Sequence, residues 1–326
     1  MMDNLVSVVM SVYNEKKEWI QKSIESVLQQ TWTSIEFIII VDNPQNNEAI
    51  DTVREYAEQD NRIRYVVNDI NRGLVYCLNR GMAMATGDIL ARMDADDISY
   101  ANRIETEMKY LKKYKADFVI GCIDFLIKDE VQKGENTVFM EPEMVKELMK
   151  FGNVSFHPTW LMKKSVFEEN GGYRSIKACE DVDFLLRSLQ KEKKIIRLQE
   201  HVHLYRLQDQ SISATNGLSQ YRKAEFLRKE YGKKHQIDHI SENKINDLGS
   251  NLSPNQIRQF QIGNRRMNDF CEALRFKKMG TALYILFVEI FRNPFYRQMF
   301  FRNVRYRIIY LYWVFRNTDN KGTDKR

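Results

Sequence analysis

The sequence predicts an α/β fold with a largely parallel, mixed sheet, followed by a helical C-terminal region. Two observations lead to this prediction. Over the first hundred residues, short β-branched apolar segments alternate with segments whose apolar residues recur at helical spacing. The strand-like segments are apolar almost throughout, which is typical of parallel strands that helices cover on both faces.

The first four strands and three helices are expected to follow one another directly. Residues 6–12 are short, apolar and rich in valine, as a buried strand requires. Residues 18–30 have apolar side chains on one helical face. Gly87 follows the third helix, at a position where a C-cap glycine is common. The other elements are strands at 36–41, 63–67 and 88–93, and helices at 46–59 and 74–85.

After residue 115 the regular alternation stops. Strands are predicted at 117–127, 158–162 and 201–207, and helices at 141–150 and 181–190. Beyond residue 215 the chain becomes helical. Ser253-Pro254-Asn255-Gln256 combines an N-cap serine, a proline at the first helical position and a capping-box glutamine, so a helix is expected to begin there.

Polar or acidic residues follow each of the first four strands. In parallel sheets, ligands bind beyond the carboxyl ends of the strands, where these residues would converge. The fourth strand is followed by Asp94, Asp96 and Asp97, three carboxylates within four residues. Such carboxylates repel one another unless a cation or water lies among them. The residues alone leave both explanations open.

Composition favours a globular protein of the cytoplasm. Apolar residues make up 43% of the chain, enough for a core. We expect no signal peptide, because the first residues lack a basic segment and a small-residue cleavage site. The cysteines, which lie far apart without a CxxC pair, indicate reduced thiols rather than disulfides or a zinc site. They are Cys77, Cys122, Cys179 and Cys271.

Basic residues are concentrated near the C-terminus. Between Arg275 and Arg326 there are 12 Lys and Arg against 3 Asp and Glu, whereas residues 1–274 carry a net charge of −3. A nucleic-acid-binding domain would spread basic residues over its folded face, so we expect no nucleic-acid partner. A basic tail rich in aromatic residues fits an anionic membrane surface better.

One face of the predicted C-terminal helix is apolar, whereas Arg302, Arg305, Trp313 and Arg316 lie off it. Such a helix can lie in a membrane surface, pack on the protein's own helices, or form a homo-oligomer interface. The sequence leaves these alternatives open. The apolar run at 282–288 is far shorter than the roughly 20 residues needed to span a bilayer. The apolar face consists of Phe301, Val304, Ile308, Leu311 and Phe315.

Five motifs, in this order, resemble those of a known family. They are SVVMSVYNE at 7–15, EFIIIVD at 36–42, NRGL at 71–74 with NRG at 79–81 and Gly87-Asp88, MDADD at 93–97, and EDVD at 180–183. Together they resemble family 2 glycosyltransferases with the nucleotide-sugar-binding, Rossmann-like GT-A fold. The resemblance is strongest to bacterial enzymes of capsular and surface polysaccharide assembly, and it covers roughly residues 5–213.

The resemblance implies a site for a UDP-sugar donor. Its Asp-x-Asp motif maps onto Asp94-Ala95-Asp96, where Asp96 would ligate a divalent cation, Mn²⁺ or Mg²⁺, and Asp94 would face the ribose. Such a cation offsets the charge that develops on the leaving diphosphate and makes the crowded carboxylates tolerable. The other donor-binding residues implied are Val12, Tyr13 and Glu15 around the nucleotide, Asp42 at the base, Arg72 near the phosphates, and Asn79.

By the same resemblance, Asp181 is the general base that deprotonates the acceptor hydroxyl, so that in-line attack inverts the anomeric carbon. A hydroxyl is a poor nucleophile, and a carboxylate within hydrogen-bond reach activates it. The alternative for Glu180-Asp181 is charge that stabilises a helix N-terminus. Glu180 and His157 are further candidates on the acceptor side, although His157 also suits a structural role.

The sequence departs from the family pattern at two places. Asp42-Asn43 replaces a pair of acidic residues, so only Asp42 is carried over. Gln208 stands where many relatives have a histidine, which leaves the third protein ligand of the metal undefined. His203 could substitute, but a structural histidine is the simpler interpretation.

We therefore expect a GT-A domain at 1–215, with a nucleotide-binding half at 1–97 and an acceptor half at 98–215. A helical region at 216–316 and a disordered tail at 317–326 would follow. The expected function is inverting, metal-dependent transfer of a hexose from a UDP-sugar to a lipid-linked or glycan acceptor, on the inner face of the cell membrane. The alternative is a non-catalytic, nucleotide-binding partner in a glycan-assembly complex.

Overall fold

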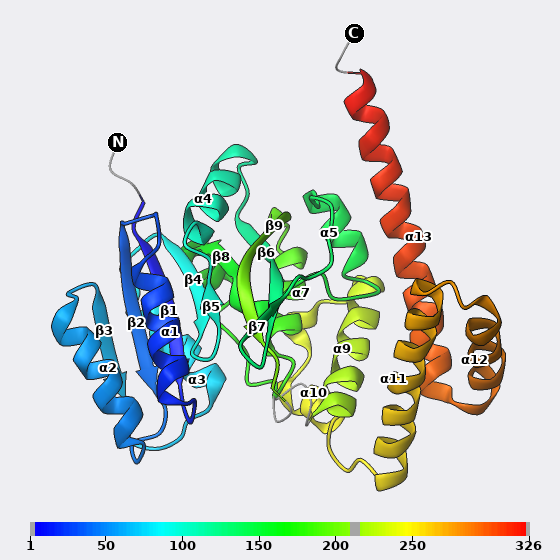
Figure 1. Ribbon diagram of the computed structural model, residues 1–326, viewed down its shortest axis with the longest axis horizontal. Helices are drawn as coiled ribbons and strands as arrows, with labels where there is room; N and C mark the ends of the chain where they lie inside the picture. The colour runs from blue at the N-terminus through cyan, green and yellow to red at the C-terminus, as the bar shows by residue number, and fades with distance from the viewer. Residues whose placement is uncertain (1–3, 209–215, 324–326) are drawn as a thin grey trace.

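The computed structural model describes residues 4–208 and 216–323, with side chains up to Arg316. In these residues one mixed sheet carries helices on both faces, and three further helices lie at one end of the molecule (Figure 1). The strand order is β3-β2-β1-β4-β8-β6-β9-β5, with β7 paired to β6. The strands are β1 (Val6–Val12), β2 (Ile35–Val41), β3 (Ile63–Val67), β4 (Ile89–Asp94), β5 (Ile98–Ser99), β6 (Phe118–Ile127), β7 (Glu130–Gln132), β8 (Trp160–Lys163) and β9 (Ile195–Arg206).

The helices of the sheet domain are α1 (Lys17–Leu28), α2 (Asn47–Gln59), α3 (Leu74–Met84), α4 (Arg103–Lys113), α5 (Pro142–Leu148), α6 (Lys164–Glu169) and α7 (Glu180–Gln190), with a 3₁₀ turn at His157–Thr159. They are followed by α9 (Gly217–Gly232), a 3₁₀ turn at Ile237–His239, α10 (Glu242–Asp247), α11 (Pro254–Arg275), α12 (Met279–Arg292) and α13 (Pro294–Thr323).

The N-terminal half of the sheet is parallel, as expected. β1 pairs with β2 and β4, and β2 pairs with β3, so their carboxyl ends lie along one edge. Val12 is opposite Val41, and Ser11 is opposite Asp94, which brings the ends of β1, β2 and β4 together. β8 runs antiparallel to β4 and β6, which makes the sheet mixed.

Alternate strand residues belong to two apolar cores. In one core, Met10 and other buried strand residues pack against Ile24 of α1 and against α2 and α4. In the second core, Val9 packs with Phe184 of α7. These four side chains are fully buried. Because helices cover both faces, the central strands are apolar almost throughout.

Three local expectations are wrong. Gly87 does not cap α3, which ends with an extended Ala85. Instead a Cβ at Gly87 would lie 2.4 Å from the Leu5 carbonyl oxygen, and the Gly87 N–H donates to Ser7 Oγ at 3.0 Å. The segment expected as a strand from residue 158 begins with the 3₁₀ turn, and β9 begins six residues before 201.

The C-terminal helices form a layer of their own beside α9. Ser253 caps α11 with the predicted capping box. A small core, including Met267 of α11 and Ile285 of α12, holds the three helices together. α13 packs on α5 and then extends past the sheet domain (Figure 1). It continues to Thr323, into the segment where disorder was expected.

One face of α13 packs inward and the other is exposed. Trp313, expected among the interfacial aromatics, is buried in the core that also contains Val9 and Phe184. The predicted apolar stripe is exposed, with Phe301 at 51%, Ile308 at 62% and Phe315 at 66%. Half or more of the surface of each of these three side chains is therefore open to solvent. Within the described ranges, no helix combines the length and the apolarity that crossing a membrane requires.

Candidate active site

The segment after β1 contributes an aromatic ring and a carboxylate to the carboxyl edge. Tyr13 is 41% exposed, whereas the preceding Val12 is buried. The Tyr13 N–H donates to Glu15 Oε2 at 2.6 Å. Burial raises the pKa of Glu15, and the charge of Asp94 acts in the same direction. Glu15 and Asp94 therefore lie close enough to repel, as expected for two sides of one site.

Asp42, at the end of β2, organises the loop that precedes α3. Its Oδ1 accepts hydrogen bonds from Asn68 Nδ2 at 2.6 Å and from the Arg72 N–H at 2.9 Å, and its Oδ2 accepts from the Gly73 N–H at 2.7 Å. Gly73 has a φ of +82°, which residues with a Cβ rarely adopt. The expected contact of Asp42 with the nucleotide base stays a prediction. A base bound there would share the buried Asp42 carboxylate with these three protein donors.

Arg72 and Asn79, also expected at the donor site, both have protein partners. The Arg72 guanidinium pairs with Asp69 at 3.0 Å on the surface. The Asn79 amide donates to the Tyr173 carbonyl oxygen at 2.9 Å and accepts from the Tyr173 N–H at 2.8 Å. In this structure Asn79 ties α3 to the segment before α7, and its donor contact stays a prediction.

Asp94 and Asp96 leave β4 at its carboxyl end, on either side of the buried Ala95. Asp94 Oδ1 lies 2.7 Å from a guanidinium nitrogen of Arg92. The Asp94 carbonyl oxygen accepts from Ser23 Oγ of α1 at 2.9 Å. Burial, together with the charges of Asp97, Asp94 and Glu15, raises the pKa of Asp96 to about 8. An ionised Asp96 is therefore unfavourable without a counter-charge.

Asp97, the third carboxylate of the cluster, is structural. Its Oδ2 lies 2.9 Å from His203 Nε2, and its Oδ1 accepts from the Arg206 N–H at 2.8 Å. Burial raises the pKa of Asp97 and lowers the pKa of His203, so both groups favour their neutral forms. This pair joins the β4 turn to β9, which gives His203 the structural role.

Gln208, the second departure from the family pattern, contacts Asp96, the candidate ligand of the cation. Its side-chain amide donates to Asp96 Oδ2. Among the described residues, no group of three or more His, Cys, Asp or Glu could hold a metal. The residues do fit a cation that arrives with a diphosphate and takes one protein carboxylate, as Mg²⁺ commonly does. Asp96, with its raised pKa, is the carboxylate that such a cation would stabilise.

Glu180 and Asp181 form the first turn of α7. Ala178, two residues earlier, has a φ of +59°, which costs about 1 kcal/mol for a residue with a Cβ and redirects the chain into the helix. The free N–H groups of this turn favour carboxylates. Burial has the larger effect: it raises the pKa of Asp181 and, with the charge of Asp181, raises the pKa of Glu180 to about 7. Such carboxylates are suited to accept a proton near neutral pH.

Arg92, which the sequence analysis did not single out, links the two acidic groups. Its side chain is only 6% exposed and pairs with Asp94. Burial alone would lower the pKa of Arg92, but the charges of Asp94, Glu180 and Asp181, with Tyr173, outweigh it and raise this pKa. The available signal was a charged residue in the middle of β4, flanked by apolar residues on both sides.

His157 is buried in the core beside this cluster. Its Nε2 shares a 2.9 Å hydrogen bond with the Tyr173 hydroxyl, and its ring lies against the fully buried Trp160, with 4.2 Å between the ring centroids. Burial, with the charge of Arg92, lowers the pKa of His157. These contacts are those of a neutral structural histidine, and the acceptor role of His157 stays a prediction.

The fold and the acidic edge can now be compared with known proteins. Residues 7–171, half of the chain, match the profile of Glycosyl transferase family 2. The chain belongs to this family. The resemblance found in the five motifs is thereby confirmed, and the protein is a glycosyltransferase by family.

Two curated glycosyltransferases align with this chain over most of their own length. The chain is 29% identical to the O-antigen biosynthesis glycosyltransferase WbnJ of Escherichia coli over 236 residues, 72% of this chain and 91% of WbnJ. It is 30% identical to the glycosyltransferase GlyG of Streptococcus pneumoniae over 235 residues, 66% of this chain and 74% of GlyG.

Solved structures of glycosyltransferases share the fold at low sequence identity. TarS of S. aureus, residues 1–349 in complex with UDP, aligns with a TM-score of 0.56 at 14% identity, over 76% of this chain and 70% of that one. The mannosyltransferase PcManGT of Pyrobaculum calidifontis, in complex with GDP-Man and Mn²⁺, aligns with a TM-score of 0.56 at 14% identity, over 88% and 86%. The sheet and its helices therefore have the expected GT-A fold.

Proposed function

We propose that this family 2 glycosyltransferase is an inverting, metal-dependent enzyme of surface polysaccharide synthesis that moves a hexose from a UDP-sugar to a lipid-linked or glycan acceptor. The observation that carries the proposal is the grouping around Arg92. Arg92 pairs with Asp94 of the Asp94–Asp96 turn, and the charges of Glu180 and Asp181 act on the same buried guanidinium. Donor-side acids and a candidate base thus share one edge of the sheet.

In the proposed reaction, Asp181 accepts the proton of an acceptor hydroxyl as its oxygen attacks the anomeric carbon. The bond to the nucleoside diphosphate breaks on the opposite face, so the configuration inverts. Glu180, next to the base, keeps its own proton to higher pH because burial and then the Asp181 charge raise its pKa. Arg92 limits the cost of ionising both carboxylates.

Asp96 would hold the divalent cation together with the donor diphosphate. When bound, such a cation offsets the negative charge of the leaving diphosphate. The raised pKa of Asp96 supports this role, because a nearby cation would favour the ionised carboxylate. The Mn²⁺ in the PcManGT complex supports a divalent cation, and the UDP of TarS and the GDP-Man of PcManGT support a nucleotide-sugar donor.

The C-terminal helices are proposed to hold the enzyme on an anionic membrane surface. On α12, Leu283, Tyr284, Phe287 and Phe291 form an exposed stripe opposite the buried Ile285, with Phe291 79% exposed. Together with the exposed stripe of α13, this apolar surface belongs to a segment of net charge +9. Exposed aromatic side chains among Arg and Lys suit a bilayer interface that carries anionic lipids. A homo-oligomer interface is the alternative for the same surface.

The enzyme is proposed to act in the cytoplasm, at the inner face of the membrane. In support, the four cysteines are free, and three of them, Cys77, Cys122 and Cys179, are buried. Free thiols are the normal state in a reducing compartment. A lipid-linked acceptor would be presented at that same surface.

Calorimetric titration with UDP and GDP, each with and without Mn²⁺, tests the proposal. We expect Mn²⁺-dependent UDP binding that Asp96→Asn weakens by tenfold or more. Asp88→Asn is the matched control, since Asp88 is exposed and precedes the opposite end of β4. Equal binding by Asp96→Asn and wild type would refute the cation assignment. Nucleotide binding without sugar transfer or donor hydrolysis would favour the non-catalytic alternative.

A further inference from the structure

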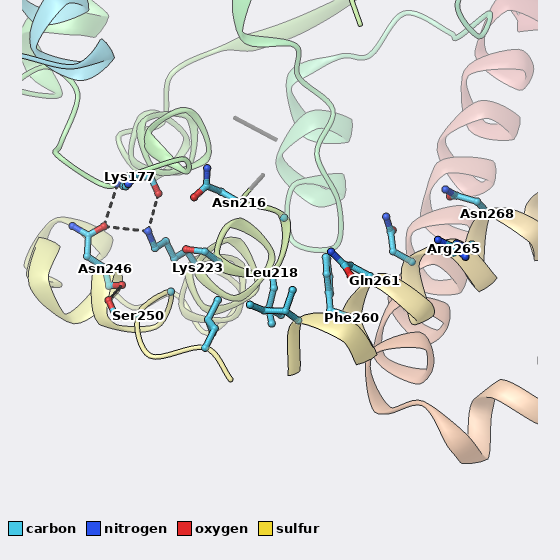
Figure 2. Close-up of a pocket in the computed structure, with 16 residues that line it drawn as sticks. Lys177, Asn216, Leu218, Lys223, Asn246, Ser250, Phe260, Gln261, Arg265 and Asn268 are labelled. Atoms are coloured by element: carbon cyan, nitrogen blue, oxygen red, sulfur yellow. Dashed lines mark hydrogen bonds between the residues drawn. The ribbon is translucent and has the colours of Figure 1, made fainter. Parts of the chain in front are cut away.

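We propose that the cavity between α9, α10 and α11 binds an anionic group of the acceptor, a phosphate or a carboxylate attached to its sugar or carrier. This inference rests on the proposed function and adds an acceptor subsite to it. The cavity has a volume of about 820 Å³ (Figure 2), and no residue of the Asp94–Asp96 turn lines it. Such a volume takes a sugar together with its charged substituent.

A buried cation lies in the wall of this cavity. The Lys223 side chain is almost fully buried, and its Nζ donates to the Lys177 carbonyl oxygen at 2.7 Å and to Asn246 Oδ1 at 3.3 Å. Both partners are neutral, and no carboxylate of the described residues forms an ion pair with this Nζ. A buried ammonium without a counter-charge is costly. Burial accordingly lowers the pKa of Lys223.

The rest of the lining adds positive charge. Lys177 and Arg265 line the cavity together with several Asn and Gln side chains, and none of the described lining residues is acidic. Figure 2 shows the Lys223 amine directed toward Lys177 and Asn246, and Arg265 on α11 at the other end of the lining. The first residues of α9, from Gly217, also line it, and the free N–H groups of a helix start favour anions. The buried lysine and the helix start are independent features that select the same sign of charge.

The position of the cavity assigns it to the acceptor rather than to the donor. Lys177, whose carbonyl oxygen holds Lys223, is four residues before Asp181 in the segment that leads into α7. The charge of Glu180 acts on Lys223. The donor-side loops after β1 and β2 contribute no residue to the cavity. An acceptor whose hydroxyl reaches Asp181 would thus carry a neighbouring anionic group toward Lys177 and Lys223.

The test is calorimetric titration of the full chain with glucose 1-phosphate, glucuronate and neutral methyl glucoside, with and without UDP and Mn²⁺. We expect the anions to bind and methyl glucoside not to bind, also when UDP fills the donor site. Arg265→Gln should weaken anion binding about fivefold, and Lys223→Met tenfold or more. Arg258→Gln is the matched control, an exposed arginine of α11 outside the cavity. If Lys223→Met does not fold, Arg265→Gln decides alone.

The inference is overturned if neither anion binds, if UDP with Mn²⁺ displaces both anions, or if Arg258→Gln weakens binding as much as Arg265→Gln. Tighter binding of glucose 1-phosphate than of glucuronate would identify a phosphate, and the reverse order a carboxylate. UDP binding in the same titrations reports separately on the proposed function, so each idea can fail without the other.

Discussion

Asp181→Asn is the substitution that tests the proposed chemistry most directly. The change keeps the shape of the side chain and removes the proton acceptor at the start of α7. Loss of a general base lowers rates about 10²- to 10⁴-fold, which corresponds to roughly 3–5 kcal/mol on the barrier. We expect sugar transfer to fall by this factor, while the Kd for UDP with Mn²⁺ stays within about twofold of wild type.

Glu180→Gln is the matched control, because the two carboxylates are neighbours and both have raised pKa values. The pKa of Glu180 lies at about 7 instead of 4.5, so ionising it costs the folded state up to about 3 kcal/mol. The folded state holds its proton more strongly than the unfolded state does. Stability should therefore fall as pH rises from about 4.5 to about 7. Glu180→Gln should remove this loss and stabilise the protein at pH 8.

The assays are initial transfer rates from pH 5 to 9 and urea unfolding at pH 5 and 8. In wild type the rate should rise with pH as Asp181 ionises. In Asp181→Asn the pKa of Glu180 should fall toward its ordinary value, because the Asp181 charge no longer opposes ionisation. Transfer by Asp181→Asn at the wild-type rate would refute the base assignment. An equal loss in Glu180→Gln would show that the pair acts through charge alone.

Three further predictions concern other parts of the molecule. Arg92→Met should lower the free energy of unfolding in urea by about 3–5 kcal/mol, because it leaves buried carboxylates unpaired. It should also move the rise of the pH–rate profile to higher pH, and an unchanged profile would contradict the linking role of Arg92. His203→Ala should cost roughly 2–4 kcal/mol, through the cavity and the lost partner of Asp97, and unfolding at the wild-type midpoint would contradict that role. Replacing Phe287 and Phe291 together by Ser should weaken flotation with vesicles containing anionic lipid by tenfold or more, whereas Val131→Ser, at an exposed position of β7, should not; wild-type flotation of the double variant would favour the oligomer interface.

Local sequence was sufficient for the order of strands and helices in the nucleotide-binding half. Each of those elements has its own apolar period, and the strands are apolar on both faces because both are covered. The capping box at Ser253 is equally local, since both of its hydrogen bonds span three residues. The Asp94–Asp96 turn and the Glu180–Asp181 start could be found for the same reason, because each motif is contiguous.

Contacts between distant segments were decided only by the tertiary structure. The role of Asp97 depends on His203, 106 residues later, and Gly87 is required by the close approach of Leu5. From the sequence, Gln208 could be interpreted only as a poor metal ligand. In the structure its side-chain amide donates a hydrogen bond to Asp96, 112 residues away.

The sequence by itself determined the fold class, the family and the acidic motifs of this protein, because periodicity and contiguous motifs are properties of neighbouring residues. The tertiary structure decided which carboxylates act together, since burial and long-range pairing set their pKa values. It alone brought Arg92 between the two acidic groups and enclosed Lys223 without an acidic partner among the described residues. It also left the stripe of α13 exposed, because whether an apolar face is covered depends on what packs against it.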